Sequence, residues 1–204
     1  MRADRSRRAA DLVYRALDAA AALAVCVLVG GESAPMFIVS VALHEAAHLA
    51  ALRLAGVRRP RFASAALGFR LHYGASSLSR RARLAITLAG CAANAAFAAA
   101  SLSLVAFCRV PASFAPSLFR LAAINLSLAA FNLLPIDGLD GGEALAVILE
   151  DRAEPRRAYA LCRALSISFT LALWLFATFV QLRVSPSPEI LLAASLLLFR
   201  ELTR

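Results

Sequence analysis

Two histidines and a glutamate stand within the stretch VALHEAAHLA, residues 41–50, inside an otherwise apolar run. His44 and His48 are four positions apart, so on a helix their side chains share one face. Two imidazoles at this spacing can bind one zinc ion, and the adjacent Glu45 can act as a general base toward a water molecule that the zinc activates. The pattern therefore predicts a hydrolytic zinc site.

The alternative is that both histidines are structural and bond to nearby backbone. The chain has only 3 histidines, and two of them lie here in an apolar run. If this run crosses a membrane, each ionisable group near its centre costs roughly 3 kcal/mol, which makes such a residue a functional candidate by default. Three ionisable groups together therefore favour the zinc site.

A catalytic zinc site of this type needs a third protein ligand and one open position. The segment FNLLPIDGLDGG, residues 131–142, joins a helix-breaking proline to Asp137 and Asp140 among three glycines. Glycine lets a chain turn sharply and approach another helix closely, and irregular backbone at membrane depth must be satisfied by protein or by a cavity. Either aspartate can supply the third ligand. The alternative, which this segment alone favours, is a plain cytoplasmic loop whose two acids belong to turns. His72 lies in a polar segment and is expected to be an ordinary exposed residue.

The stretch HEAAH in a membrane helix, followed by NLLPIDGLDG at residues 132–141, resembles the site-2 proteases, a family of intramembrane zinc metalloproteases. The resemblance implies that His44, His48 and Asp140 bind Zn2+ and that Glu45 is the catalytic base. It implies that Asn132 helps to hold the substrate or the motif loop. The family spacing selects Asp140 over Asp137.

Residues 90–94, GCAAN, resemble a further family element, Gly-Pro-x-x-Asn, with Cys91 in place of the proline. The layout also resembles the compact branch represented by the stage IV sporulation protease. The known member of that branch carries a C-terminal nucleotide-sensing CBS domain, and another branch carries a PDZ domain. The 204 residues leave room for neither. We therefore expect a single membrane-embedded metalloprotease domain over 1–204, with its core motifs in 36–150.

Composition supports a membrane protein. Hydrophobic residues make up 61% of the chain and charged residues only 17%, whereas soluble domains are nearer half apolar and a quarter charged. The net charge is +9 and every basic residue is arginine. The arginines stand in short groups between apolar runs, which is typical of loops that flank membrane spans. They do not form the single basic patch of a nucleic-acid-binding protein, so no nucleic-acid partner is expected.

The expected fold is an all-α polytopic membrane protein with about six transmembrane helices. The predicted spans are residues 11–30, 36–56, 84–107, 117–134 and 159–182, with 189–199 as a compressed span or an interfacial helix. The stretch FRLHYG, residues 69–74, alternates apolar and polar side chains, which predicts a short β-like segment after the zinc helix.

Arginine placement predicts the orientation. The segments before the first span, between the second and third, and between the fourth and fifth hold nearly all loop arginines. The positive-inside rule then places the N-terminus in the cytoplasm and the chain as a multi-pass protein in the cell membrane. The expected partners are the lipid bilayer, membrane-anchored protein substrates and regulatory membrane proteins. The alternative function is a non-catalytic transporter or scaffold derived from the same family.

Overall fold

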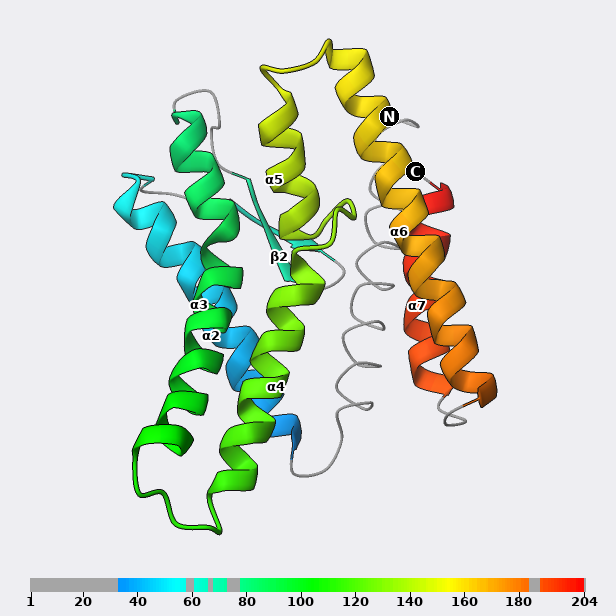
Figure 1. The fold of residues 1–204 in the computed structure, drawn as a ribbon. Coiled ribbons are helices and arrows are strands. Elements are labelled where there is room, and N and C mark those ends of the chain that lie inside the picture. The colour runs from blue at the N-terminus through cyan, green and yellow to red at the C-terminus, as the bar shows by residue number, and fades with distance from the viewer. Residues whose placement is uncertain (1–32, 58–60, 66–67, 73–77, 184–187, 204) are drawn as a thin grey trace.

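The computed structural model describes residues 33–57, 61–65, 68–72, 78–183 and 188–203 (Figure 1). Its helices are α2 (Ala34–Leu54), α3 (Arg80–Phe107), α4 (Ala115–Asn132), α5 (Asp140–Leu149), α6 (Pro155–Arg183) and α7 (Pro188–Thr203), and its strands are β1 (Arg61–Ala65) and β2 (Gly68–His72). The predicted first span, residues 11–30, lies outside the described residues. The described residues are predominantly helical, as the expected all-α fold requires.

Local sequence sets several helix boundaries. Proline stands in the first turn of α2 and of α4, where its missing N–H is not needed. Ser79 caps α3 by accepting a hydrogen bond from the backbone N–H of Ala82 at 3.2 Å. Gly56, with a φ of 80°, lies just beyond the end of α2, in a conformation that favours glycine.

Three of the described helices, α2, α3 and α6, are long and apolar enough to cross a membrane. The expected count of about six spans is therefore not confirmed. Helix α4 has 18 residues but carries Arg120, Asn125 and Asn132, which lower its hydropathy. Helix α7 has 16 residues, fewer than the roughly 20 that cross a bilayer core. The long apolar helices nevertheless identify a membrane protein.

The helices form two groups joined by α5 (Figure 1). Helices α2, α3 and α4 contact one another, and α6 packs along α7. Helix α5 contacts α3 on one side and α6 on the other. The middle of α3, AGCAANAAFAAAS, is rich in small residues, which let helices approach closely in a membrane.

The far end of α5 is anchored to the start of α3 by ion pairs. Arg83 pairs with Glu150, and Arg80 lies 3.4 Å from Asp151 and donates to the backbone oxygen of Ile148 at 2.8 Å. The hydrogen bond from Arg83 holds the pKa of Glu150 below its ordinary value. These contacts place the end of α5 and the beginning of α3 at the same end of the molecule.

Strands β1 and β2 pair antiparallel, with Arg61 opposite His72 and Ala65 opposite Gly68. Residues 69–72 of the predicted β-like segment lie in β2, and residues 73 and 74 lie outside the described part of the chain. The hairpin follows α2, the helix that carries the two neighbouring histidines.

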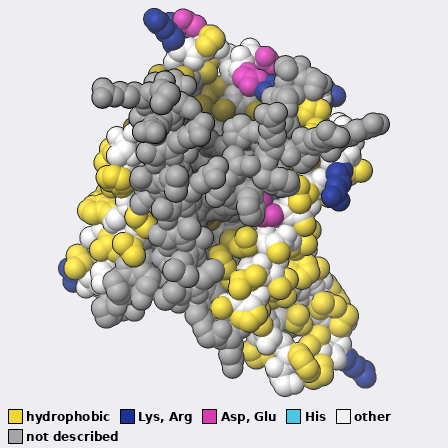
Figure 2. All heavy atoms as spheres, turned by 180° about the vertical axis from the view of Figure 1, so that it is seen from behind, with side chains coloured by type: hydrophobic (Ala, Val, Ile, Leu, Met, Phe, Trp, Pro, Cys, Tyr) yellow, Lys and Arg dark blue, Asp and Glu magenta, His cyan; other side chains and the backbone are white. Residues whose placement is uncertain are grey.

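Large apolar side chains cover much of the outer surface (Figure 2). Exposed examples occur on α2, α3, α4 and α6, including Ile38, Leu102, Phe119 and Phe176. In Figure 2, hydrophobic side chains dominate the lower part of the described surface, and most of the visible acidic side chains lie near the upper end. This apolar exposure is unfavourable in water and favourable in lipid.

Candidate metal centre

His44 and His48 lie on the buried face of α2. The buried residues of this helix are Ser40, His44, His48 and Leu52, which recur every fourth position and therefore form one stripe along the helix. The two histidines have exposed fractions of only 6% and 7%. The spacing of the motif thus does place both imidazoles on one inward face.

Asp140 reaches this face because the chain turns sharply between α4 and α5. Gly138 has a φ of 90°, which favours glycine, and Asp140 is the first residue of α5. A Cβ atom at Gly141 would lie 2.1 Å from the backbone oxygen of Leu133, so only glycine fits where α5 begins. The glycines of the motif therefore permit the tight approach that brings Asp140 inward.

The three side chains converge on one point. The Nε2 atoms of His44 and His48 are 3.1 Å apart, and Oδ2 of Asp140 lies 3.2 Å from the first and 3.3 Å from the second. Ligand atoms about 2.0–2.1 Å from a tetrahedral zinc lie roughly 3.3 Å from one another. The donor triangle therefore has the dimensions of one face of a tetrahedral zinc site.

Hydrogen bonding orients His48 for metal binding. Its Nδ1 lies 2.8 Å from the backbone oxygen of Ile86 and can only donate to it, which leaves the Nε2 lone pair directed at the donor triangle. Nδ1 of His44 is buried and has no hydrogen-bond partner among the described residues. The ring planes of the two histidines are inclined at 75° to each other.

Gly90 of α3 forms the wall beside the two histidines. A Cβ atom at this position would lie 2.5 Å from Nε2 of His48 and 2.6 Å from Nε2 of His44. Such contacts are far shorter than van der Waals distances, so any side chain here would displace the imidazoles. The absence of a side chain at Gly90 preserves the space next to the donor triangle.

The carboxylate of Asp140 is partly buried and lies beside both imidazoles. The ionised form is the one that binds metal. Cys91 of α3 donates from Sγ to Oδ2 of Asp140 at 3.2 Å, so the residue that replaces proline in the family element contacts a predicted ligand.

The other residues singled out in the sequence lie outside the donor triangle. Glu45 is partly buried on α2 beside His44 and does not belong to the donor triangle, which suits a base rather than a ligand. Asn132 is partly buried, and its Nδ2 donates to the backbone oxygen of Leu128 at 3.0 Å within α4. Asp137 is exposed, so of the two aspartates the structure brings Asp140 to the histidines. His72 lies in β2.

The donor set fits zinc. Two imidazole nitrogens and one carboxylate oxygen, with all three atoms within 4.8 Å of one another, are the borderline donors that zinc accepts in catalytic sites. No described fourth side chain joins this metal-ligating group. Two residues of the centre were not expected from the sequence as contacts of the ligands, namely Gly90 and Cys91; the only signal was their place in the family-like GCAAN segment.

Comparisons with known proteins concern the sequence family and the fold. Residues 110–175 match the sequence model of peptidase family M50, a range that contains Asn132 and Asp140 but begins after His44 and His48. The fold is similar to a solved structure, a site-2 protease from Methanocaldococcus jannaschii, with a TM-score of 0.64 and 20% identity over 94% of this chain and 87% of that chain. No curated protein sequence matches the chain. Residues 110–175 thus resemble peptidase family M50, and the fold of the chain resembles that of a site-2 protease.

Proposed function

We propose that the chain is an intramembrane zinc metalloprotease that hydrolyses peptide bonds of membrane-anchored proteins. The observation that carries the proposal is the donor triangle of His44, His48 and Asp140, buried between apolar helices and adjacent in sequence to Glu45. The match to peptidase family M50 supports the reaction type.

In this proposal His44, His48 and Asp140 hold Zn2+, which when bound supplies Lewis acidity to water and to the scissile carbonyl. Glu45 accepts a proton from the attacking water and delivers it to the leaving amine, as a general base and then a general acid. The backbone oxygen of Ile86 keeps His48 in the tautomer that presents Nε2. Asn132, at the end of α4, is the proposed contact for substrate or for the motif loop.

The proposed orientation places the N-terminus, the arginine-rich segment between α2 and α3, and the arginine-rich segment after α5 in the cytoplasm. The ion pairs of Arg80 and Arg83 with Asp151 and Glu150 support a common side for these two segments. Counted from Met36 at about 1.5 Å per residue, His44 lies about 12 Å and His48 about 18 Å into a core of roughly 30 Å. The site then lies near the middle of the bilayer core. Reporter fusions after Ala112 should read external and fusions after Glu154 internal; the reverse result would refute this orientation.

The proposed reaction is tested with the full chain purified in detergent and a panel of membrane-anchored candidate substrates. We expect cleavage within or beside the apolar segment of at least one candidate, loss of cleavage after removal of metal by a chelator, and recovery when zinc is restored. Cleavage that persists after complete metal removal would refute a zinc-dependent mechanism. Zinc binding without cleavage of any candidate would favour the non-catalytic alternative.

A further inference from the structure

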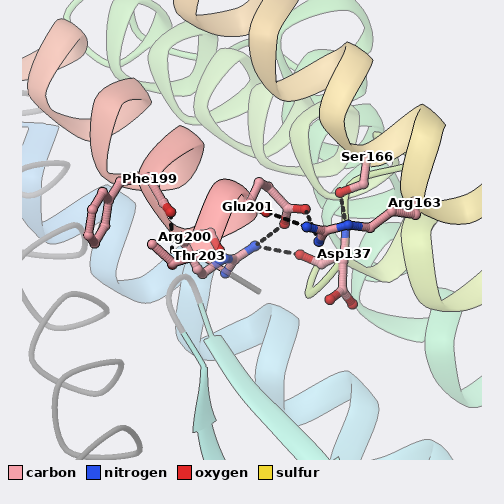
Figure 3. A network of polar contacts seen from close by, with 7 residues as sticks. All are labelled: Asp137, Arg163, Ser166, Phe199, Arg200, Glu201 and Thr203. Atoms are coloured by element: carbon pink, nitrogen blue, oxygen red, sulfur yellow. Dashed lines mark hydrogen bonds and ion pairs between the residues drawn. The ribbon is translucent and has the colours of Figure 1, made fainter.

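Helices α6 and α7 hold the main chain of the loop that leads into α5. The backbone N–H of Asp137 donates to Oγ of Ser166 on α6 at 2.8 Å. The backbone oxygen of the same residue accepts a hydrogen bond from the guanidinium of Arg200 on α7. Both polar main-chain groups of this one residue are therefore fixed from the α6–α7 pair (Figure 3).

The group that holds Arg200 is itself buried. Glu201 has an exposed fraction of 0%, and its carboxylate lies 3.4 Å from the guanidinium of Arg200 and 3.5 Å from that of Arg163 on α6. Arg163 also donates to the backbone oxygen of Glu201 at 2.6 Å. A buried carboxylate is tolerated only when it is paired and hydrogen-bonded, so the three charges fix one another and fix the end of α7 against α6.

Only a short, tightly bonded turn separates Asp137 from the predicted metal ligand Asp140. Ile136 is fully buried, and its backbone oxygen accepts from the N–H of Leu139 at 3.0 Å. The backbone oxygen of Leu139 in turn accepts from Glu143 inside α5 at 3.1 Å. These hydrogen bonds link the turn that contains Asp137 to the first turn of α5. A displacement of Asp137 would therefore be transmitted to Asp140.

The two histidines and Asp140 belong to different helices. His44 and His48 lie on α2, which packs with α3 and α4, whereas Asp140 starts α5, which contacts both α3 and α6. The far end of α5 is fixed by Arg80 and Arg83 of α3. The near end, which carries the carboxylate, is fixed by the α6–α7 contacts at Asp137.

We propose that Ser166, Arg200 and Glu201 are positioning residues that hold the Asp140 carboxylate in register with His44 and His48. Ser166 and Arg200 act directly on the loop, and Glu201 acts through Arg200. The inference rests on the proposed zinc function of the site. It extends the functional centre to the end of α7, 60 residues beyond the ligand in sequence. Groups that orient metal ligands typically change metal affinity by roughly 10–100-fold when removed.

The test compares two serine-to-alanine variants of the full chain in detergent, with zinc affinity measured by competition with a chromophoric chelator. Ser166→Ala removes the acceptor at the loop. Ser195→Ala is the matched control, because Ser195 accepts a hydrogen bond from Trp174 at 3.0 Å across the same α6–α7 interface. We expect the zinc Kd to rise about tenfold for Ser166→Ala and to stay at the wild-type value for Ser195→Ala, while both variants lower the apo unfolding temperature by similar amounts.

Arg200→Ala and Arg200→Lys provide a second comparison. We expect the zinc Kd to rise by roughly 10–100-fold for the alanine variant and to recover in part for lysine, which can still donate to the backbone oxygen of Asp137. Wild-type zinc affinity in Ser166→Ala would overturn the inference, whether or not Arg200→Ala folds, as would an equal loss of affinity in Ser195→Ala. If the wild type binds zinc and shows these differences yet cleaves nothing, only the proteolytic function fails. If the wild type binds no zinc, both proposals fail.

Discussion

Nε2 of His44 lies 3.2 Å from Oδ2 of Asp140, although the two residues belong to different helices that are not adjacent in sequence. The contact requires α2 to present its buried stripe, the loop after α4 to reverse at Gly138, and α5 to begin at the aspartate. With Nε2 of His48 added, the three atoms are spaced as three ligands of a tetrahedral zinc.

The two neighbouring aspartates are expected to differ in their effect on metal binding. Asp140→Asn replaces a carboxylate in the donor triangle by a neutral amide, so we expect zinc content near zero after purification and no cleavage. Asp137→Asn changes an exposed side chain whose main-chain hydrogen bonds remain, so we expect near wild-type zinc and activity. Elemental analysis of both variants measures this. The ligand assignment would be reversed if Asp137→Asn lost both zinc and activity while Asp140→Asn kept both.

Gly90→Ala should abolish or strongly weaken zinc binding. The new methyl group would stand 2.5–2.6 Å from both imidazole Nε2 atoms, so the rings must move out of the donor triangle. Alanine has the higher helix propensity, by about 1 kcal/mol, so α3 itself should not lose stability locally. Ala95→Ser, which adds one atom on the exposed side of the same helix, is the control. Zinc affinity is measured in both variants by chelator competition. Unchanged affinity in Gly90→Ala would show that the ligands lie elsewhere.

The thiol of Cys91 is expected to support Asp140. Its Sγ donates to the ligand oxygen at 3.2 Å, so Cys91→Ala should weaken zinc binding by roughly tenfold, and Cys91→Ser, which keeps a donor, should weaken it less. Cys108→Ala changes an exposed thiol and serves as the control. Equal zinc affinity for Cys91→Ala, Cys91→Ser and wild type would mean that the thiol only fills space.

Local spacing explains why part of this centre was predictable. Two histidines four residues apart on a helix must share a face, so the sequence alone predicted how His44 and His48 lie. Local sequence patterns do not distinguish Asp137 from Asp140 as the third ligand. The family spacing selects Asp140, and the structure brings Asp140 to the two histidines. The roles of Glu45 and Asn132 stay predictions.

The contacts that escaped prediction are long-range. Arg200 donates a hydrogen bond to the backbone oxygen of Asp137, which is 63 residues away in sequence. The periodicity of an apolar helix does not predict such a partner. The expected count of about six spans is not confirmed within the described residues, and α4 contains polar residues that lower its hydropathy. Asn125 is fully buried and donates to Ser40 of α2 at 2.8 Å. A residue that lowers hydropathy can therefore be a helix–helix contact rather than a sign of exposure.

The Glu45→Gln variant shows whether a zinc site on α2 and α5 uses Glu45 as its base. Glutamine keeps the size of the side chain but cannot accept the proton, and the residue lies outside the donor triangle. Zinc content and cleavage are measured in one preparation, on a substrate that the wild type cleaves. We predict about one zinc per chain, as in the wild type, and a loss of turnover of at least roughly 100-fold. Wild-type turnover in Glu45→Gln, or loss of its zinc, would contradict this prediction.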